Sequence, residues 1–514
     1  MNGAESLIAT ARVAGIDVCF ANPGTTEMAL VTALDSVAGI RPVLGLFEGV
    51  CTGAADGFGR MAGRPALTLL HLGPGLANGL ANLHNARRAR TPVVNVVGDH
   101  STRHLQFDSL LKSDIESLAA PVSAWVRTST EANSVAADFA QAVRAAVTPP
   151  GGVATLIIPA DLQSAPVVGP ASLSTPAAAP APESSRVASA VETVRRGRSS
   201  ALLIGGPACQ RGALASVARI AGATNCRVFV ETFPARMERG AGTPHVERFP
   251  YFPEQVAGLL NGVEHVVLVG TPDPVAMFGW PGAPNRMLPE HVEVVSLAGP
   301  EEDVAAALAA VADVMSAAAG SGAFAPFDPP ARPAGSLDAN TLAVALAATL
   351  PEHAIVVDEG ATSSVMLYPA LASAAPHTWL TLTGGAIGQG LPCATGAAIA
   401  CPDRSVIAFQ ADGSGLYTLQ ALWTQARESL DVTTIICANR TYRILQIELM
   451  RAGVAEPGAA ARGLTNLGEP ALDWVKLAEG MGVPAGRAED AESMVRALER
   501  ALAEPGPHLI EAVL

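Results

Sequence analysis

The chain alternates short runs of apolar residues with longer segments in which apolar residues recur at helical spacing. In the first third of the chain these runs occupy residues 17–22, 42–47, 66–72, 93–99 and 154–160. Further runs occupy residues 200–206, 227–232, 265–270 and 292–297, and then 354–360, 405–410, 433–439 and 508–514. Segments such as Val187–Arg196 and Glu492–Ala503 have the period of an amphipathic helix. This alternation is typical of parallel β-sheets flanked by helices, so we predict an α/β fold.

Two stretches rich in proline, alanine and serine interrupt this pattern. They lie at Val167–Ser185 and Ser321–Ser336, and neither has apolar periodicity. Such compositions are typical of linkers. We therefore predict three α/β domains at residues 1–166, 186–320 and 337–514, each of ordinary domain size.

Composition excludes several classes of protein. The formal net charge of −14 disfavours a nucleic-acid partner, because backbone phosphates would be repelled. The N-terminal stretch MNGAESLIATARVAG has no basic region followed by an apolar core, and no apolar run reaches the roughly 18–20 residues of a membrane span. The 7 cysteines are scattered, which favours reduced thiols. We predict a cytoplasmic protein that binds small molecules, with neither a membrane nor a nucleic acid as partner.

One carboxylate and one amide follow two successive apolar runs. Asp412 follows one run after a single residue, Ala411, and Asn439 ends the next run, 27 residues after Asp412. Ligands bind at the carboxyl ends of strands in open α/β sheets. Because a carboxylate, an amide oxygen and a nearby backbone carbonyl suit Mg²⁺, we predict that Asp412, Asn439 and Thr441 bind this metal. Ser414 and the N–H groups of the helix that begins at Gly413 would then hold phosphate groups.

Each of these features has a simpler explanation when it is taken alone. Asp412 would cap a helix and Asn439 would begin a turn. Glu48, which follows the run at 42–47 and begins a helix of small residues, would be an acid favoured by the helix dipole. The combination of strand context and spacing is what favours a site that holds a metal and a diphosphate.

With these residues the chain resembles the thiamine-diphosphate-dependent enzymes. Their shared signature is Gly-Asp-Gly, followed by an asparagine after a little under thirty residues. This chain has Ala411 in place of the first glycine but keeps the metal-binding positions. The resemblance implies thiamine diphosphate and Mg²⁺ as cofactors. It also implies a pyrimidine-binding domain at 1–166, a Rossmann-like middle domain at 186–320 and a diphosphate-binding domain at 337–514.

The resemblance also implies roles for individual residues. Glu48 would contact N1′ of the aminopyrimidine and favour the imino tautomer, whose N4′ removes the C2 proton. In LTGGAIGQGLP (Leu382–Pro392), Gly385 would offer its carbonyl to the aminopyrimidine, and Ile387 would bend the cofactor into a V shape. A glycine-rich turn with a core isoleucine is the simpler interpretation of that segment. The expected neighbours of the diphosphate are Thr362, Gly413, Ser414, Tyr417 and Tyr442.

Substrate-side residues come from the first block. ANPGTTEM (Ala21–Met28) resembles a loop of the acetolactate synthase and benzoylformate decarboxylase branch, in which Thr25 falls where the decarboxylase has an active-site serine. His71 aligns with a catalytic histidine of that decarboxylase, although a histidine at the end of a strand is often structural. The second catalytic histidine has no counterpart after the run at 265–270. The segment GTPDPVAMFGWPGAPNRM does not resemble the flavin-contacting segments of acetolactate synthases, so we predict no FAD.

The resemblance therefore implies a thiamine-diphosphate- and Mg²⁺-dependent decarboxylase or carboligase of 2-oxo acids, similar to acetolactate synthases. The alternatives are a benzoylformate-type decarboxylase and a non-catalytic nucleotide- or CoA-binding α/β protein. Leu445 favours an apolar substrate side chain, whereas Glu448 disfavours a bulky aromatic one unless it is paired. In the family, Glu48 and the metal site meet across a subunit interface, which implies a homodimer or homotetramer. The identity of the 2-oxo acid and the presence of a regulatory subunit stay open.

Overall fold

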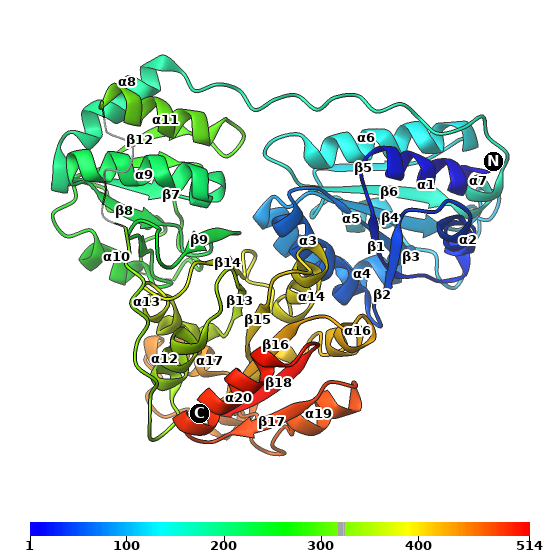
Figure 1. Cartoon of the computed structure of the whole chain (residues 1–514). Helices are drawn as coiled ribbons and strands as arrows, with labels where there is room; N and C mark the ends of the chain where they lie inside the picture. Colours follow the sequence, from blue (N-terminus) through cyan, green and yellow to red (C-terminus); the bar gives the residue numbers. More distant parts are fainter. Residues whose placement is uncertain (281, 317–321, 323) are drawn as a thin grey trace. The chain divides into compact units, whose positions relative to one another are not determined.

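The computed structural model describes residues 1–280, 282–316, 322 and 324–514 (Figure 1). It forms two compact units. The first unit comprises Met1–Pro176, Ala331–Leu367 and Leu382–Leu514, and the second comprises Ala177–Pro330 and Tyr368–Thr381. The described residues form three sheets dominated by parallel strands and flanked by helices, which confirms the predicted α/β fold. Within the described ranges, none of the helices combines the length and the hydropathy that a bilayer-spanning segment requires.

The first sheet is parallel and has six strands in the order β2-β1-β3-β4-β6-β5. Its strands are β1 (Val18–Asn22), β2 (Arg41–Leu44), β3 (Ala66–His71), β4 (Val93–Asp99), β5 (Trp125–Thr128) and β6 (Val153–Pro159). The sequence predicts five of them and misses the short, half-buried β5. The helices of this part are α1 (Gly3–Val13), α2 (Met28–Ser36), α3 (Glu48–Ala62), α4 (Leu72–Ala89), α5 (Ile115–Ala119), α6 (Val135–Val147) and α7 (Ala160–Ser164).

A second parallel arrangement in the first unit runs in the order β17-β18-β16-β15-β13. Its strands are β13 (Ile355–Glu359), β15 (Val406–Ala411), β16 (Val432–Ala438), β17 (Ala485–Ala488) and β18 (His508–Val513). The central strands β15 and β16 are buried along nearly their whole length, which explains their continuous apolar runs. The surrounding helices are α12 (Ala339–Thr349), α14 (Gly390–Ala400), α15 (Asp412–Gly415), α16 (Ala421–Arg427), α17 (Arg443–Arg451), α18 (Ala459–Thr465), α19 (Trp474–Gly480) and α20 (Ala491–Ala503).

Helices α3 and α14 join the two sheets of the first unit. Their backbones approach so closely that a Cβ atom added to Gly57 would lie 2.0 Å from the carbonyl oxygen of Cys393. A Cβ atom on Gly396 would lie 1.8 Å from the carbonyl oxygen of Ala54. Only glycine fits at either position. This contact places the helix that begins at Glu48 directly against the helix that follows the glycine-rich segment, and α3 and α14 lie side by side in Figure 1.

The second unit holds a parallel sheet in the order β10-β8-β7-β11-β12. Its strands are β7 (Ser200–Ile204), β8 (Arg227–Val230), β10 (Glu247–Arg248), β11 (His265–Val269) and β12 (Glu293–Ala298). In the same unit, β9 (Met237–Arg239) pairs in antiparallel fashion with β14 (His377–Thr381). The helices are α8 (Ser184–Val194), α9 (Arg211–Thr224), α10 (Pro253–Leu259) and α11 (Val304–Val314).

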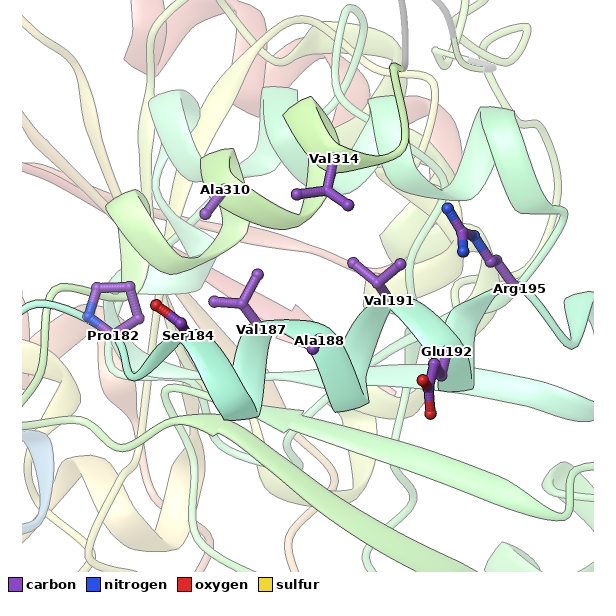
Figure 2. A pocket seen from close by; sticks show the side chains of 9 residues that line it. All are labelled: Pro182, Ser184, Val187, Ala188, Val191, Glu192, Arg195, Ala310 and Val314. Atoms are coloured by element: carbon purple, nitrogen blue, oxygen red, sulfur yellow. The ribbon is translucent and has the colours of Figure 1, made fainter.

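A groove of about 510 Å³ lies between α8 and α11 of this unit (Figure 2). Its walls are mainly aliphatic, from Val187 and Val191 on α8 and from Ala310 and Val314 on α11. None of the residues that the sequence predicts for chemistry lines it. The residues that the sequence predicts for the functional site all lie in the first unit.

The first predicted linker has no helix or strand between residues 167 and 183, and α8 begins at Ser184. Part of the second predicted linker lies outside the described residues. In its described part, residues 324–336, only two isolated bridges form, Phe324 with Pro244 and Ser336 with Asp490. The division of the chain into three domains stays a prediction, because two of the sheets share one compact unit.

Candidate active site

Asp412 and Asn439 leave neighbouring strands at the same edge. Strands β15 and β16 pair in parallel along their length, as the sequence predicts. The Asp412 side chain is only 3% exposed and accepts hydrogen bonds from the backbone N–H groups of Gly413 (2.8 Å) and Arg440 (2.7 Å). The second bond ties the end of one strand to the segment that follows the other. Burial raises the pKa of the Asp412 carboxyl, and the N–H groups of Arg440 and Gly413 oppose this rise.

The oxygen atoms around Asp412 fit a hard cation. Asn439 Oδ1 accepts a hydrogen bond from the Thr441 N–H at 3.0 Å. The Thr441 hydroxyl donates to the carbonyl of Thr465 at 2.7 Å and accepts from Gln446 at 2.8 Å, so a metal ligand from Thr441 would have to be its backbone carbonyl. No cluster of three or more His, Cys, Asp or Glu side chains forms a metal site in the described part of the chain. A set of one carboxylate, one amide and one carbonyl fits Mg²⁺ rather than zinc.

After Asp412, the groups that could contact phosphates are backbone N–H groups rather than side chains. A Cβ atom on Gly413 would lie 2.4 Å from Cε1 of Tyr442, so the tyrosine ring packs directly on this glycine. The Ser414 hydroxyl donates to the carbonyl of Ala411 at 3.2 Å and accepts from Gln410 Nε2. Since this hydroxyl already has partners in the protein, a phosphate contact from Ser414 would come from its backbone N–H.

The other predicted diphosphate neighbours lie near this edge. Tyr417 is exposed, and a Cβ atom on Gly388 would lie 2.6 Å from Cβ of Tyr417. Thr362 lies in the 3₁₀ helix Ala361–Val365, which follows β13. Ala361 at the start of this helix has a φ of 49°, a left-handed conformation that non-glycine residues adopt rarely and mostly at functional positions.

The glycine-rich segment is fixed at both ends. Gly385 and Gly388 have φ values of 73° and 94°, in the region that favours glycine. Between them, the Ala386 backbone is held by the side chain of Asn85, whose Oδ1 accepts from the Ala386 N–H (3.2 Å) and whose Nδ2 donates to its carbonyl (2.8 Å). Ile387 therefore follows a clamped residue. Its predicted role against the cofactor stays a prediction.

Glu48 is the first residue of α3 and is half-buried. Its Oε2 accepts a hydrogen bond from Asn78 Nδ2 of α4 at 3.0 Å. A Cβ atom on Gly75, in the same helix, would lie 3.0 Å from Glu48 Oε1. Gly75 thus leaves space for the Glu48 carboxylate at the edge of the first sheet. The aminopyrimidine, the predicted partner of Glu48, would have to approach this edge.

His71 forms a pair with a carboxylate that the sequence analysis did not identify as functional. Its Nδ1 lies 2.8 Å from Oε2 of Glu27, a fully buried side chain that also accepts from the Gly24 N–H (2.7 Å) and the Thr26 hydroxyl (2.5 Å). Because a carboxylate accepts, Nδ1 carries a proton, and Nε2 is left to exchange one with a ligand. Thr25 is exposed beside this pair, whereas Thr26 lies 3.3 Å from Nδ1 of His71.

The backbone after His71 is strained. Leu72 is buried and has a φ of 52°, although it is not a glycine. Such conformations cost roughly 1–3 kcal/mol and persist where surrounding structure enforces them, often at functional sites. The signal for Glu27 is present in the sequence, since it closes the Asn-Pro-Gly-Thr-Thr-Glu loop. A sequence pattern does not show, however, that its carboxylate turns inward to a histidine from a different strand.

Comparisons with known proteins agree with this geometry. The family model "Thiamine pyrophosphate enzyme, N-terminal TPP binding domain" matches residues 1–120, and "Thiamine pyrophosphate enzyme, C-terminal TPP binding domain" matches residues 360–512. Over 518 residues, 100% of this chain and 99% of the relative, the chain is 51% identical to the "Putative acetolactate synthase large subunit IlvX" of Mycobacterium tuberculosis. The chain belongs to the thiamine-pyrophosphate-dependent enzymes. The resemblance identified from the sequence is thereby confirmed.

Two further relatives come from the decarboxylase branch of these thiamine-dependent enzymes. The chain is 30% identical over 524 residues to the benzoylformate decarboxylase of Pseudomonas aeruginosa, which covers 97% of this chain and 96% of that protein. Among solved structures, the thiamine diphosphate-dependent 4-hydroxybenzoylformate decarboxylase of Rhodococcus jostii superposes with a TM-score of 0.87 at 25% identity, covering 99% of this chain and 98% of that one. The thiamine-binding domains of the family support thiamine diphosphate as the cofactor of this chain.

The structure leaves the two halves of the predicted site separate. In the described part of this single chain, no hydrogen bond or ion pair joins Glu48 or His71 to Asp412, Asn439 or Thr441. The pyrimidine-side residues and the metal-side residues thus form two half-sites at two sheet edges.

Proposed function

We propose that this thiamine-dependent enzyme uses Mg²⁺ and acts on a 2-oxo acid as a decarboxylase or carboligase similar to acetolactate synthases. The observation that carries the proposal is the oxygen-lined edge at Asp412 and Asn439, in a chain 51% identical to a relative named as an acetolactate synthase large subunit. When bound, thiamine diphosphate would supply a nucleophilic carbon that adds to the keto group and a positively charged ring that takes up the electron pair left by departing CO₂.

The metal-side residues bind and orient the cofactor. Asp412, Asn439 and the carbonyl of Thr441 would hold the cation, which screens the diphosphate charge. Backbone N–H groups at Gly413 and Ser414 would hold phosphate oxygens. The predicted neighbours of the diphosphate and aminopyrimidine are Thr362, Gly385, Ile387, Tyr417 and Tyr442.

The pyrimidine-side residues move protons. Glu48 would share a proton with N1′ of the aminopyrimidine. His71, oriented through Nδ1 by Glu27, would give or take a proton at Nε2, next to the substrate carbonyl. Thr25 would offer its hydroxyl group to the substrate carboxylate from the same loop, whereas the Thr26 hydroxyl donates to Glu27.

The substrate side chain would lie near α17. Leu445 on this helix is partly exposed and presents an apolar surface. Glu448, three residues on, is paired with Arg451, whose Nη1 lies 3.2 Å from both carboxylate oxygens. Because that acid is paired, its charge is a weaker obstacle to an apolar or aromatic acyl group.

Substrate turnover tests the proposal. Purified enzyme with thiamine diphosphate and Mg²⁺ is assayed on pyruvate, 2-oxobutyrate, branched 2-oxo acids and benzoylformate, with CO₂ and carbon products measured separately. We expect CO₂ release from at least one of them, and no requirement for FAD. Cofactor binding without turnover of any substrate would refute the 2-oxo acid assignment.

A benzoylformate-type decarboxylase is the second candidate, and the His71–Glu27 pair favours it. His71 would deliver a proton to the former keto carbon after CO₂ has left, which is the step that leads to an aldehyde. Aldehyde from benzoylformate without any acyloin product would identify this second candidate, whereas acyloin or acetolactate formation from pyruvate would identify the first.

The active enzyme would be a homodimer or homotetramer whose sites are completed by two copies of the chain. This proposal is supported by the two separate half-sites and by large apolar side chains that are exposed in the first unit. After β4, Leu110 is 99% exposed, and near the metal edge Leu464 is 79% exposed. Mixing Glu48→Gln with Asp412→Ala subunits after reversible dissociation tests it. Mixed assemblies would contain unaltered sites and regain activity, whereas sites confined to one chain would stay inactive.

A further inference from the structure

Glu359 is a buried acid to which neither the sequence signature nor the mechanism gives a role. It ends strand β13 and is 3% exposed. A buried carboxylate is costly unless hydrogen bonds compensate it. The contacts of this one therefore indicate what it does.

Both carboxylate oxygens of Glu359 bind the glycine-rich segment. Oε1 accepts from the Gly388 N–H at 2.6 Å, and Oε2 accepts from the Gly390 N–H at 2.5 Å. Gly390 is the first residue of α14, where backbone N–H groups have no acceptor within the helix. A Cβ atom on Gly390 would lie 2.2 Å from Oε1 of Gln410 and 2.9 Å from Oε2 of Glu359, so a larger residue would displace these side chains. The carboxylate thus fixes the end of the segment and the start of the helix together.

The peptide on the other side of Gly388 is fixed as well. Its carbonyl accepts from the Thr418 hydroxyl at 2.8 Å and from Asn82 Nδ2 at 3.2 Å. Ala386 is held by Asn85. Ile387 therefore lies between two residues whose backbones are held by side chains of α4, β13 and the turn at Thr418, and Glu359 accepts the hydrogen bond from the N–H group of the second residue, Gly388.

We propose that Glu359 is a positioning residue, which holds the Gly385–Gly388 segment and thereby sets the position of Ile387 against the bound aminopyrimidine. The inference rests on the proposed cofactor geometry, because Ile387 acts only if thiamine diphosphate binds beside it. Two acceptor oxygens are needed. In Glu359→Gln, the amide oxygen accepts from one glycine while the NH₂ group faces the N–H of the other. In Glu359→Asp, the shorter side chain reaches only one of them.

Hydrogen–deuterium exchange of the cofactor-free protein tests the clamp directly. We expect exchange of the amides in residues 384–390 to rise about tenfold in Glu359→Gln, since a buried donor loses its acceptor. The matched control is Asp431→Asn, an acid that directly precedes β16 at the opposite edge of the same sheet and accepts from Ser405 at 3.2 Å. It should leave these amides unchanged. Unchanged protection in Glu359→Gln would overturn the proposal, whatever the enzyme turns over.

A double-mutant cycle then tests whether Glu359 acts through Ile387. With cofactor bound, C2–H/D exchange of thiamine is measured in Glu359→Gln, Ile387→Ala and the double variant. We expect the first change to slow exchange at least tenfold in wild type but less than twofold in the Ile387→Ala background. Equal effects in both backgrounds would show that Glu359 is merely structural. If Glu359→Gln does not fold, Glu359→Asp is measured in the same cycle. Failure of the substrate panel leaves this readout intact, because C2 exchange needs no substrate.

Discussion

Removing the Glu359 carboxyl should change how the stability of the protein depends on pH. Burial raises the pKa of Glu359 from 4.5 to about 7, opposed by the N–H groups of Gly390 and Gly388. Between these two values the folded protein keeps a proton that the unfolded chain has released. The contribution of Glu359 to the free energy of unfolding is therefore fully present below the pKa of the unfolded chain, and it is lost as the pH rises through the pKa of the folded protein. At 1.36 kcal/mol per pKa unit, it amounts to roughly 3 kcal/mol.

Glutamine at position 359 does not titrate, so the comparison isolates this group. The difference in unfolding free energy between wild type and Glu359→Gln should change by roughly 3 kcal/mol from about pH 5 to about pH 8. Wild type would lose stability relative to the variant. The charged or titratable groups on neighbouring elements are Asp358 on β13, Cys393 on α14 and the Asp56–Arg60 pair on α3, and they are common to both proteins.

The assay is differential scanning calorimetry of cofactor-free protein across this pH range. A change of roughly 3 kcal/mol corresponds to about 6–12 °C in the difference between the two melting temperatures, if the unfolding unit has the size of one domain. The exposed acid Glu479 provides a control, since Glu479→Gln should follow wild type at every pH. Parallel curves for wild type and Glu359→Gln would refute the reasoning, because they would show that Glu359 ionises as easily in the folded protein as in the unfolded chain.

Three further predictions concern the site itself. Asp412→Ala should abolish retention of thiamine diphosphate, since the cation loses its carboxylate; calorimetric affinity equal to wild type would contradict this. Glu48→Gln should slow C2–H/D exchange of bound thiamine by about 10²-fold or more while cofactor affinity stays within a few-fold, as nuclear magnetic resonance and titration can show. Glu27→Gln should lower kcat more than it raises KM and should shift the pH profile of kcat, because His71 Nδ1 then faces a neutral amide in place of a negatively charged carboxylate; an unchanged profile would separate Glu27 from catalysis.

The parts of the fold that the sequence predicts are those with an unambiguous apolar run. Strands β15 and β16 are buried on both faces, so their runs are continuous and their ends are clear. The missed strands β5 and β17 have only four residues each, and partly exposed residues dominate both. Strand β14 has the sequence HTWLT, in which polar residues are buried by tertiary contacts that composition does not reveal. A local sequence pattern does not predict a strand whose burial depends on packing against a distant segment.

The candidate site, like the fold, has features that the sequence predicts and features that it does not. The adjacency of Asp412 and Asn439 follows from the order of parallel strands, and the structure confirms it. The predicted phosphate contact of Ser414 does not follow from such an order and stays a prediction, while its hydroxyl bonds Ala411 and Gln410. Glu27 and Glu359 were not predicted as functional, because each takes its partners from a backbone N–H or from a separate strand. The spacing of residues in the sequence does not reveal such partners.

Three buried acids of the first unit have one physical feature in common. Glu27, Glu359 and Asp412 are each less than 5% exposed, and each accepts hydrogen bonds from backbone N–H groups near the carboxyl ends of parallel strands. Burying a carboxylate disfavours folding unless its bonds compensate it, so a chain selected for stability alone would replace these acids with apolar side chains. Each acid instead holds a neighbouring group: Glu27 holds a histidine, Glu359 a glycine-rich segment, and Asp412 the joined ends of two strands. Neutral replacements should therefore impair proton transfer, cofactor geometry and cofactor retention respectively, even where the protein stays folded.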